Sequence, residues 1–150
     1  MKRIYLASDH AGAILKGHIR DHLAASGYEV TDLGVNATAS VDYPDYAASL
    51  AEAMLQDKEA KGVLVCGSGI GISIAANRFS HIRAALVTDV TTARLSRQHN
   101  DANVVALGER LTGSATALDC VDAFLTTEFE GGRHQRRVDK LLSPQPASSE

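Results

Sequence analysis

The chain has 150 residues, of which 45% are apolar and 22% are charged, so a single domain with a substantial core is expected. The formal net charge of −3 excludes the strongly basic surface that recruits nucleic acid or an anionic membrane. The two cysteines, Cys66 and Cys120, are far apart and lack metal-ligand spacing, and free thiols suit a reducing cytoplasm.

Apolar strands alternate with amphipathic helices along the chain. Strands are predicted at 3–7, 28–33, 63–65, 83–87 and 103–107. Amphipathic helices are predicted at 14–23 and 46–55, where apolar residues share one helix face. Further helices are predicted at 72–76, 91–98 and 113–125, and a last, charged helix at 130–142. We therefore expect one domain over residues 1–142, followed by a polar, proline-containing and disordered tail at 143–150.

Alternation of strand and helix predicts a parallel sheet that is covered on both faces and connected by right-handed crossovers. Five strands fit a flavodoxin-like three-layer α/β sandwich of order 2-1-3-4-5, with an additional C-terminal helix. Ligands of such sheets bind beyond the carboxyl ends of the strands, where the order reverses between the first and third strands. The segments that follow those two strands are 8–10 and 66–69, so a site is expected there.

The stretch from Cys66 to Gly71 combines a thiol with three glycines between a strand and a helix. This geometry directs backbone N–H groups at an anion and favours thiolate over thiol. A base or nucleophile beside an oxyanion cradle is therefore predicted; the alternative is a tight connection with a buried, inert cysteine. Three familiar signatures fail at Ile72, which occupies the lysine slot of a P-loop, the third glycine of a dinucleotide fingerprint and the arginine of a cysteine phosphatase loop.

Two further segments carry acid–base groups. Asp9 and His10 place an acid beside a base at the predicted switch point, although an aspartate there could also cap the following helix. His99 and Asn100 follow a helix and precede the fifth strand, which places them near the amino end of the sheet, away from Cys66 of the same chain. His99 is either a residue that favours the helix dipole or one that reaches the pocket of a neighbouring subunit in an obligate dimer.

Arginines near the C-terminus form a candidate anion grip. Arg133 and Arg137 are four residues apart, so they share a helix face on which two guanidinium groups can hold a phosphate. Arg110, just past the fifth strand, could add a third; the alternative is a solvated cationic surface. The six histidines show no spacing typical of a zinc site.

Five blocks of the sequence resemble the type B ribose-5-phosphate isomerases, a family that includes the subunits of galactose-6-phosphate isomerase. The blocks are SDHAG (8–12), DYP (42–44), CGSGIGISIAAN (66–77), SRQHNDAN (96–103) and EGGRH (130–134). The resemblance extends from residue 1 to about residue 142. It implies interconversion of D-ribose 5-phosphate and D-ribulose 5-phosphate through an enediolate, without a metal or organic cofactor, in a dimer or tetramer whose sites are built from two chains.

The resemblance also implies a role for each candidate residue. Cys66 matches the base that moves a proton between C1 and C2, and His99 matches the group that opens the furanose ring with help from Asp9 and Ser68. The remaining matches are the oxyanion cradle at Gly67, Ser68, Gly69, Ile70 and Gly71, the substrate-binding amide of Asn100, and the phosphate grip of His10, Arg110, Arg133 and Arg137.

Two alternatives remain open at this point. One is an isomerase of a six-carbon phosphosugar, such as allose 6-phosphate or galactose 6-phosphate, which would share the chemistry and differ in pocket length. The other is a non-catalytic phosphosugar-binding module, because a fold alone does not determine a function.

Overall fold

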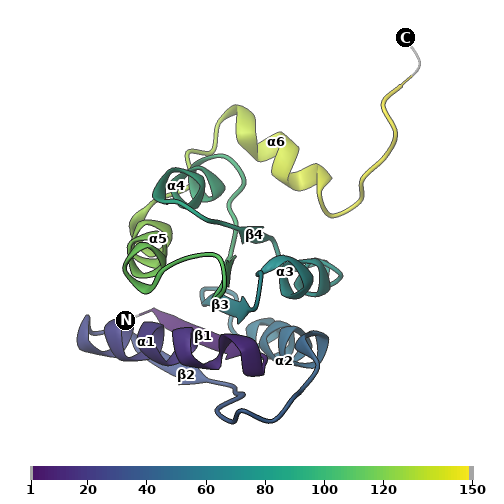
Figure 1. Ribbon diagram of the computed structural model, residues 1–150. Helices are drawn as coiled ribbons and strands as arrows, with labels where there is room; N and C mark the ends of the chain where they lie inside the picture. Colours follow the sequence, from purple (N-terminus) through teal and green to yellow (C-terminus); the bar gives the residue numbers. More distant parts are fainter. Residues whose placement is uncertain (1, 149–150) are drawn as a thin grey trace.

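The computed structural model describes residues 2–148 and shows strands and helices in alternation (Figure 1). The strands are β1 (Arg3–Ser8), β2 (Glu29–Asp32), β3 (Lys61–Cys66), β4 (Ala84–Leu86) and β5 (Val104–Gly108). The helices are the short 3₁₀ turn η1 (His10–Gly12), α1 (Ala13–Ala25), α2 (Tyr43–Leu55), α3 (Ile70–Ala76), α4 (Val90–Gln98), α5 (Ser114–Thr126) and α6 (Arg133–Lys140). The predicted α/β class is therefore confirmed.

The five strands form one parallel sheet of order β2-β1-β3-β5-β4. The last two strands are exchanged relative to the predicted order 2-1-3-4-5, so that part of the prediction is wrong. The physical reason is burial: all five residues of β5 are buried, whereas β4 has three residues, none of them fully buried. A strand that is apolar on both faces belongs inside a sheet, and the shorter, partly exposed strand takes the edge.

Strand order also decides which helices share a face. Right-handed crossovers place α1 and α4 on one face, because β1→β2 and β4→β5 run in the same direction across the sheet. The crossovers β2→β3 and β3→β4 run in the opposite direction, which places α2 and α3 on the other face. Figure 1 shows this division, with α5 joining α1 and α4, and the buried core splits into two clusters in the same way.

The sheet therefore has a switch point on each side of β3. The chain leaves β1 and β5 toward one face and leaves β3 toward the other. The carboxyl end of β3 thus lies in a crevice between two oppositely directed connections, which is where doubly wound sheets bind ligands.

Helix α6 lies outside the three layers, beyond α4 and β4 (Figure 1). It is shorter than the predicted helix over 130–142, because Gly131 and Gly132 have positive φ values of 66° and 54° and precede its first turn. Its buried residues are His134 and Val138. Residues 143–148 are exposed and form no helix or strand; their disorder stays a prediction, and residues 149–150 lie outside the described residues.

Within residues 2–148, no helix combines the length and the apolar character that crossing a bilayer requires.

Candidate active site

Cys66 is the last residue of β3 and opens onto a cavity of about 530 Å³. Its side chain belongs to the α2/α3 face of the sheet and is only 4% exposed. The backbone N–H of Gly69 donates a hydrogen bond to Sγ at 3.1 Å. Sγ therefore lies at the edge of the cavity with one fixed N–H donor directed at it.

Cys120 has the opposite character. It is fully buried in the other core cluster, and burial raises the pKa of its thiol. An apolar enclosure disfavours the thiolate, so Cys120 fills the core, as its apolar neighbours in the sequence predict.

The glycine loop after Cys66 presents backbone N–H groups to the cavity. Gly69 has φ 78°, and a Cβ there would lie 2.8 Å from the carbonyl carbon of Leu107, so only glycine fits. The Gly69 N–H already serves Cys66, and the Ile70 N–H donates to Ser68 Oγ at 3.1 Å.

Three of the five predicted cradle amides remain free. In the described part of the chain, the N–H groups of Gly67, Ser68 and Gly71 make no hydrogen bond to a protein acceptor. Free, fixed donors beside a cavity are what an oxyanion site requires.

Two residues after β1 line the same cavity. Asp9 is 6% exposed and its Oδ1 accepts the Gly12 N–H at 3.1 Å, so the predicted capping role is real. His10 accepts the Val41 N–H through Nδ1 at 3.2 Å. A neutral His10 ring therefore carries its proton on Nε2, the nitrogen that remains able to donate.

A charged and an aromatic residue also line the cavity, Arg110 just after β5 and Tyr43 at the start of α2. The Arg110 guanidinium follows β5 and lies over Gly67: a Cβ on that glycine would be 3.5 Å from its central carbon. Tyr43 packs its ring on Gly71, where a Cβ would be only 2.6 Å from Cζ. Sequence reasoning assigned no role to Tyr43, although its position at the start of α2, after the edge strand β2, could have indicated one.

The remaining predicted residues lie elsewhere, at the amino end of the sheet. His99 caps α4, four residues before Asn103, whose carbonyl accepts the N–H of Gly62 at the start of β3 at 2.9 Å. Asn100 lines a separate cavity of about 400 Å³. In one chain the predicted site is therefore divided between the two ends of the sheet.

His99 stands against helix α6. Its ring stacks on that of His134 with centroids 4.5 Å apart and planes 15° apart. Burial, followed by the charge of His99, lowers the pKa of His134. Arg133 and Arg137 are exposed on the same helix, so two of the predicted phosphate ligands lie with His99 rather than with Cys66.

One group among the described residues has ligand atoms close enough to consider for a metal: His99, Glu130 and His134, all within 4.8 Å of one another. The two imidazole planes are nearly parallel and face each other. Their nitrogen lone pairs therefore lie in separate planes and do not converge on a single ion, as metal coordination requires.

Comparison with known proteins matches residues 4–141 to the family described as Ribose/Galactose Isomerase. Ribose-5-phosphate isomerase B of Escherichia coli K12 is 48% identical over 143 residues, covering 95% of this chain and 96% of that protein.

Solved structures give the same result. The Clostridium thermocellum ribose-5-phosphate isomerase B is 51% identical with a TM-score of 0.91, covering 93% of this chain and 95% of that one. The Mycoplasma genitalium ribose-5-phosphate isomerase B, solved with bound ribulose-5-phosphate, is 44% identical with a TM-score of 0.90, covering 93% of both chains. The resemblance predicted from five sequence blocks is confirmed, and the chain belongs to the ribose/galactose isomerase family.

Proposed function

We propose that this protein interconverts D-ribose 5-phosphate and D-ribulose 5-phosphate through an enediolate. The observation that carries the proposal is Cys66 Sγ, which accepts an N–H bond at the mouth of a cavity with free backbone donors. The bound ribulose-5-phosphate in the Mycoplasma genitalium relative supports the choice of sugar.

The site is suited to moving a proton between adjacent carbons. When the aldose is converted to the ketose, Cys66 as thiolate removes the proton from C2 of the open-chain sugar. The electron pair moves onto the carbonyl oxygen at C1. The N–H groups of Gly67, Ser68 and Gly71 stabilise the oxygen that becomes negative; one such donor is worth about 3–4 kcal/mol. A proton passes from the C2 hydroxyl to the C1 oxygen, and return of the carbon-bound proton from Cys66 to C1 gives the ketose and regenerates the thiolate.

We further propose that two copies of the chain complete each site. The Cys66 cavity provides His10 and Arg110 for a phosphate, whereas His99, Asn100, Arg133 and Arg137 lie at the other end of the sheet. A two-fold pair can bring the Cys66 end of one copy to the His99 end of its partner.

Exposed apolar side chains support this pairing. On α3 and just after it, Ile70, Ile74 and Phe79 are 49%, 61% and 37% exposed, and Ile70 borders the Cys66 cavity. A contiguous apolar patch beside a half-formed site fits an interface between copies. We place the protein in the cytoplasm, which keeps the Cys66 thiol reduced, with residues 1–142 as its single catalytic domain.

Replacement of the thiol tests the catalytic proposal. Cys66→Ala should lower kcat by about 10³-fold or more, because no neighbouring group can replace a lost base at this position. Circular dichroism and thermal unfolding should match the parent protein, since alanine fits the buried site with a small cavity. Normal turnover by this variant would exclude Cys66 as the base.

A six-carbon phosphosugar is the second candidate, because the matched family is described by both ribose and galactose. Values of kcat/KM for ribose 5-phosphate, allose 6-phosphate and galactose 6-phosphate, measured side by side, decide between them. A non-catalytic binding module would bind the sugars without exchanging the C2 hydrogen with solvent.

A further inference from the structure

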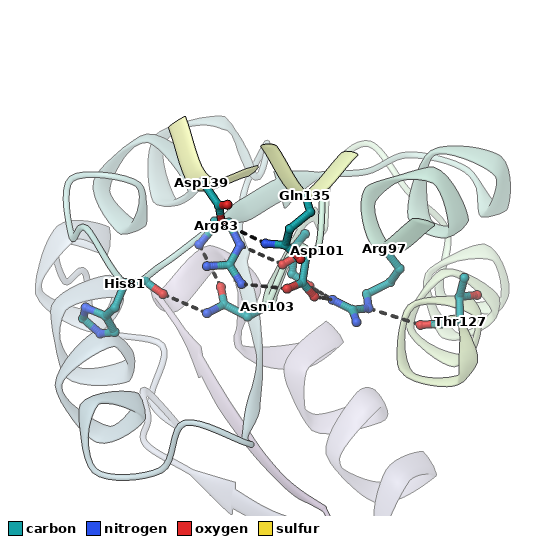
Figure 2. A network of polar contacts seen from close by, with 9 residues as sticks. His81, Arg83, Arg97, Asp101, Asn103, Thr127, Gln135 and Asp139 are labelled. Atoms are coloured by element: carbon teal, nitrogen blue, oxygen red, sulfur yellow. Dashed lines mark hydrogen bonds and ion pairs between the residues drawn. The ribbon is translucent and has the colours of Figure 1, made fainter. Parts of the chain in front are cut away.

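An ion pair closes over the short turn that carries His99 and Asn100 (Figure 2). Arg97 Nη1 donates to Asp101 Oδ1 at 2.8 Å, so the two ends of the turn are joined directly. Arg97 itself is only 5% exposed and also donates to the carbonyls of Ala102 at 2.6 Å and Thr127 at 3.2 Å. Its guanidinium group is thus fixed by two acceptors at the C-terminal end of the turn and by a third at the end of α5.

A second arginine holds Asp101 from the opposite side. Arg83 Nε donates to the Asp101 carbonyl at 2.8 Å, and its Nη2 lies 3.4 Å from Oδ2. Asn103 fixes the Arg83 segment in turn, accepting the Arg83 N–H at 2.7 Å and donating to the His81 carbonyl at 2.8 Å. Figure 2 shows Asp101 between the two guanidinium groups.

Asp101 has an unusual backbone conformation. Its φ is 48°, and no other non-glycine residue in the described chain has a positive φ. An L-residue adopts this conformation only at a cost, and aspartate and asparagine tolerate it best. The two arginines offset that cost, and the resulting bend carries the chain from α4 into β5 while leaving Asn100 exposed.

We propose that Asp101 is a positioning residue for the opening of the furanose ring, acting through His99 and Asn100. The inference rests on the proposed function. Only three residues separate Arg97 from Asp101, and the backbone bonds Asp101 N–H to Arg97 and Ala102 N–H to Ser96 close the same turn. Loss of the carboxylate removes its side-chain contacts to Arg97 and Arg83, and so loosens the position of the His99 ring. A shift of about 1 Å in a catalytic group can cost about 10²-fold in rate.

The chemistry of the two sugars isolates this step. Ribose 5-phosphate closes through its C4 oxygen, so the C1–O4 bond must break, with a proton leaving the C1 hydroxyl and a proton arriving at O4. Ribulose 5-phosphate has its C5 oxygen blocked by phosphate, so it cannot form a furanose and enters as an open chain. Exchange of its C1 hydrogen with solvent therefore needs Cys66 and the cradle but no ring opening.

The test compares these two reactions in Asp101 variants. Asp101→Gly removes the carboxylate and accepts φ 48° without strain, so it isolates the two ion pairs. We expect kcat from ribose 5-phosphate to fall about 10- to 100-fold, with C1 exchange of ribulose 5-phosphate in D₂O within about twofold of the parent. Asp101→Asn retains one acceptor and should give a smaller loss. Asp21→Asn, which breaks the exposed Arg20–Asp21 pair, is the matched control and should change neither rate.

Two results would overturn the inference: an unchanged kcat for ribose 5-phosphate in Asp101→Gly, or an equal loss in isomerisation and exchange. Should the glycine variant unfold, Asp101→Asn supplies the same comparison. Failure of the proposed function looks different, because the parent protein itself would then show neither isomerisation nor exchange.

Discussion

The two thiols of this chain lie in different surroundings. Both are nearly or fully buried, but Cys66 ends a strand at a cavity and accepts an N–H bond, whereas Cys120 is enclosed by apolar side chains. The sequence suggested this difference through neighbours: glycines follow Cys66, and large apolar residues surround Cys120.

Gly69 is where the loop is least tolerant of change. Gly69→Ala should lower the free energy of unfolding by about 2–4 kcal/mol, because its positive φ strains an L-residue and the added Cβ meets Leu107 and Leu86. Urea unfolding measures the loss. Gly113→Ala is the control: φ is −61° and nothing lies within 4 Å of its Cβ, so a loss of similar size there would refute the steric argument.

Arg137 carries a prediction about binding rather than stability. Arg137→Ala should raise KM for ribose 5-phosphate about 10- to 100-fold with little change in kcat, since the phosphate lies far from the reacting carbons. Lys140→Ala, at another exposed cation of the same helix, should leave KM unchanged. Steady-state kinetics measures KM for both variants. Equal KM values for Arg137→Ala and Lys140→Ala would show that Arg137 does not bind the phosphate.

At the scale of elements, the sequence pattern predicted all five strands and the six α-helices, but neither the 3₁₀ turn η1 nor the order of the sheet. Residues 103–107 and 83–87 are both apolar runs, and neighbours along the chain were expected to be neighbours in space. The order depends instead on which run is buried on both faces, a tertiary property that β5 has and β4 lacks.

The same limit applies to the site. The glycine, thiol and acid–base residues could be predicted as site candidates because they lie next to one another in the sequence. Tyr43 and Asp101 could not, because the Tyr43 ring contacts Gly71 across a gap in sequence, and Asp101 depends on its backbone conformation and on contacts with Arg83 and Arg97.

Helix α1 and strand β2 are joined by a buried charge pair. Lys16 is fully buried and its Nζ lies 2.5 Å from Asp32 Oδ1 and 2.8 Å from Asn36 Oδ1. Although burial opposes it, hydrogen bonds from Lys16 and the Gly34 N–H lower the pKa of Asp32. The pair therefore stabilises the fold above the unfolded-state pKa of Asp32, and that stabilisation is lost as pH falls through the lowered value.

Lys16→Met should cost about 3–5 kcal/mol of unfolding free energy at pH 7, because Asp32 then loses its buried partner. The double variant Lys16→Met, Asp32→Asn should recover part of this loss. Urea titrations between pH 7 and pH 3 should show a flatter acid dependence for the double variant than for the parent. Equal stability of parent and single variant would show that Asp32 is satisfied by its other donors.

At the scale of the whole molecule, shared sites predict complementation. Cys66→Ala and His99→Ala proteins should each be nearly inactive. After mixing under conditions that exchange subunits, half of the dimers are mixed, and each holds one intact site built from Cys66 of one copy and His99 of the other. Activity should then rise to about a quarter of the parent value, whereas a site contained in one chain would give no recovery. Light scattering on the parent protein checks that it is at least a dimer.

Because β3 and β5 run from the His99 end to the Cys66 end, the length of these strands sets the distance between the two ends. At about 3.3 Å per residue, the six residues of β3 set a spacing of about 20 Å between the two half-sites of one copy. In a symmetric pair, adding or deleting a residue in these strands would misalign both pockets at once. The proposed two-copy site therefore requires a fixed length of the core strands in addition to their packing, a requirement that does not apply to the loops at the edge of the sheet.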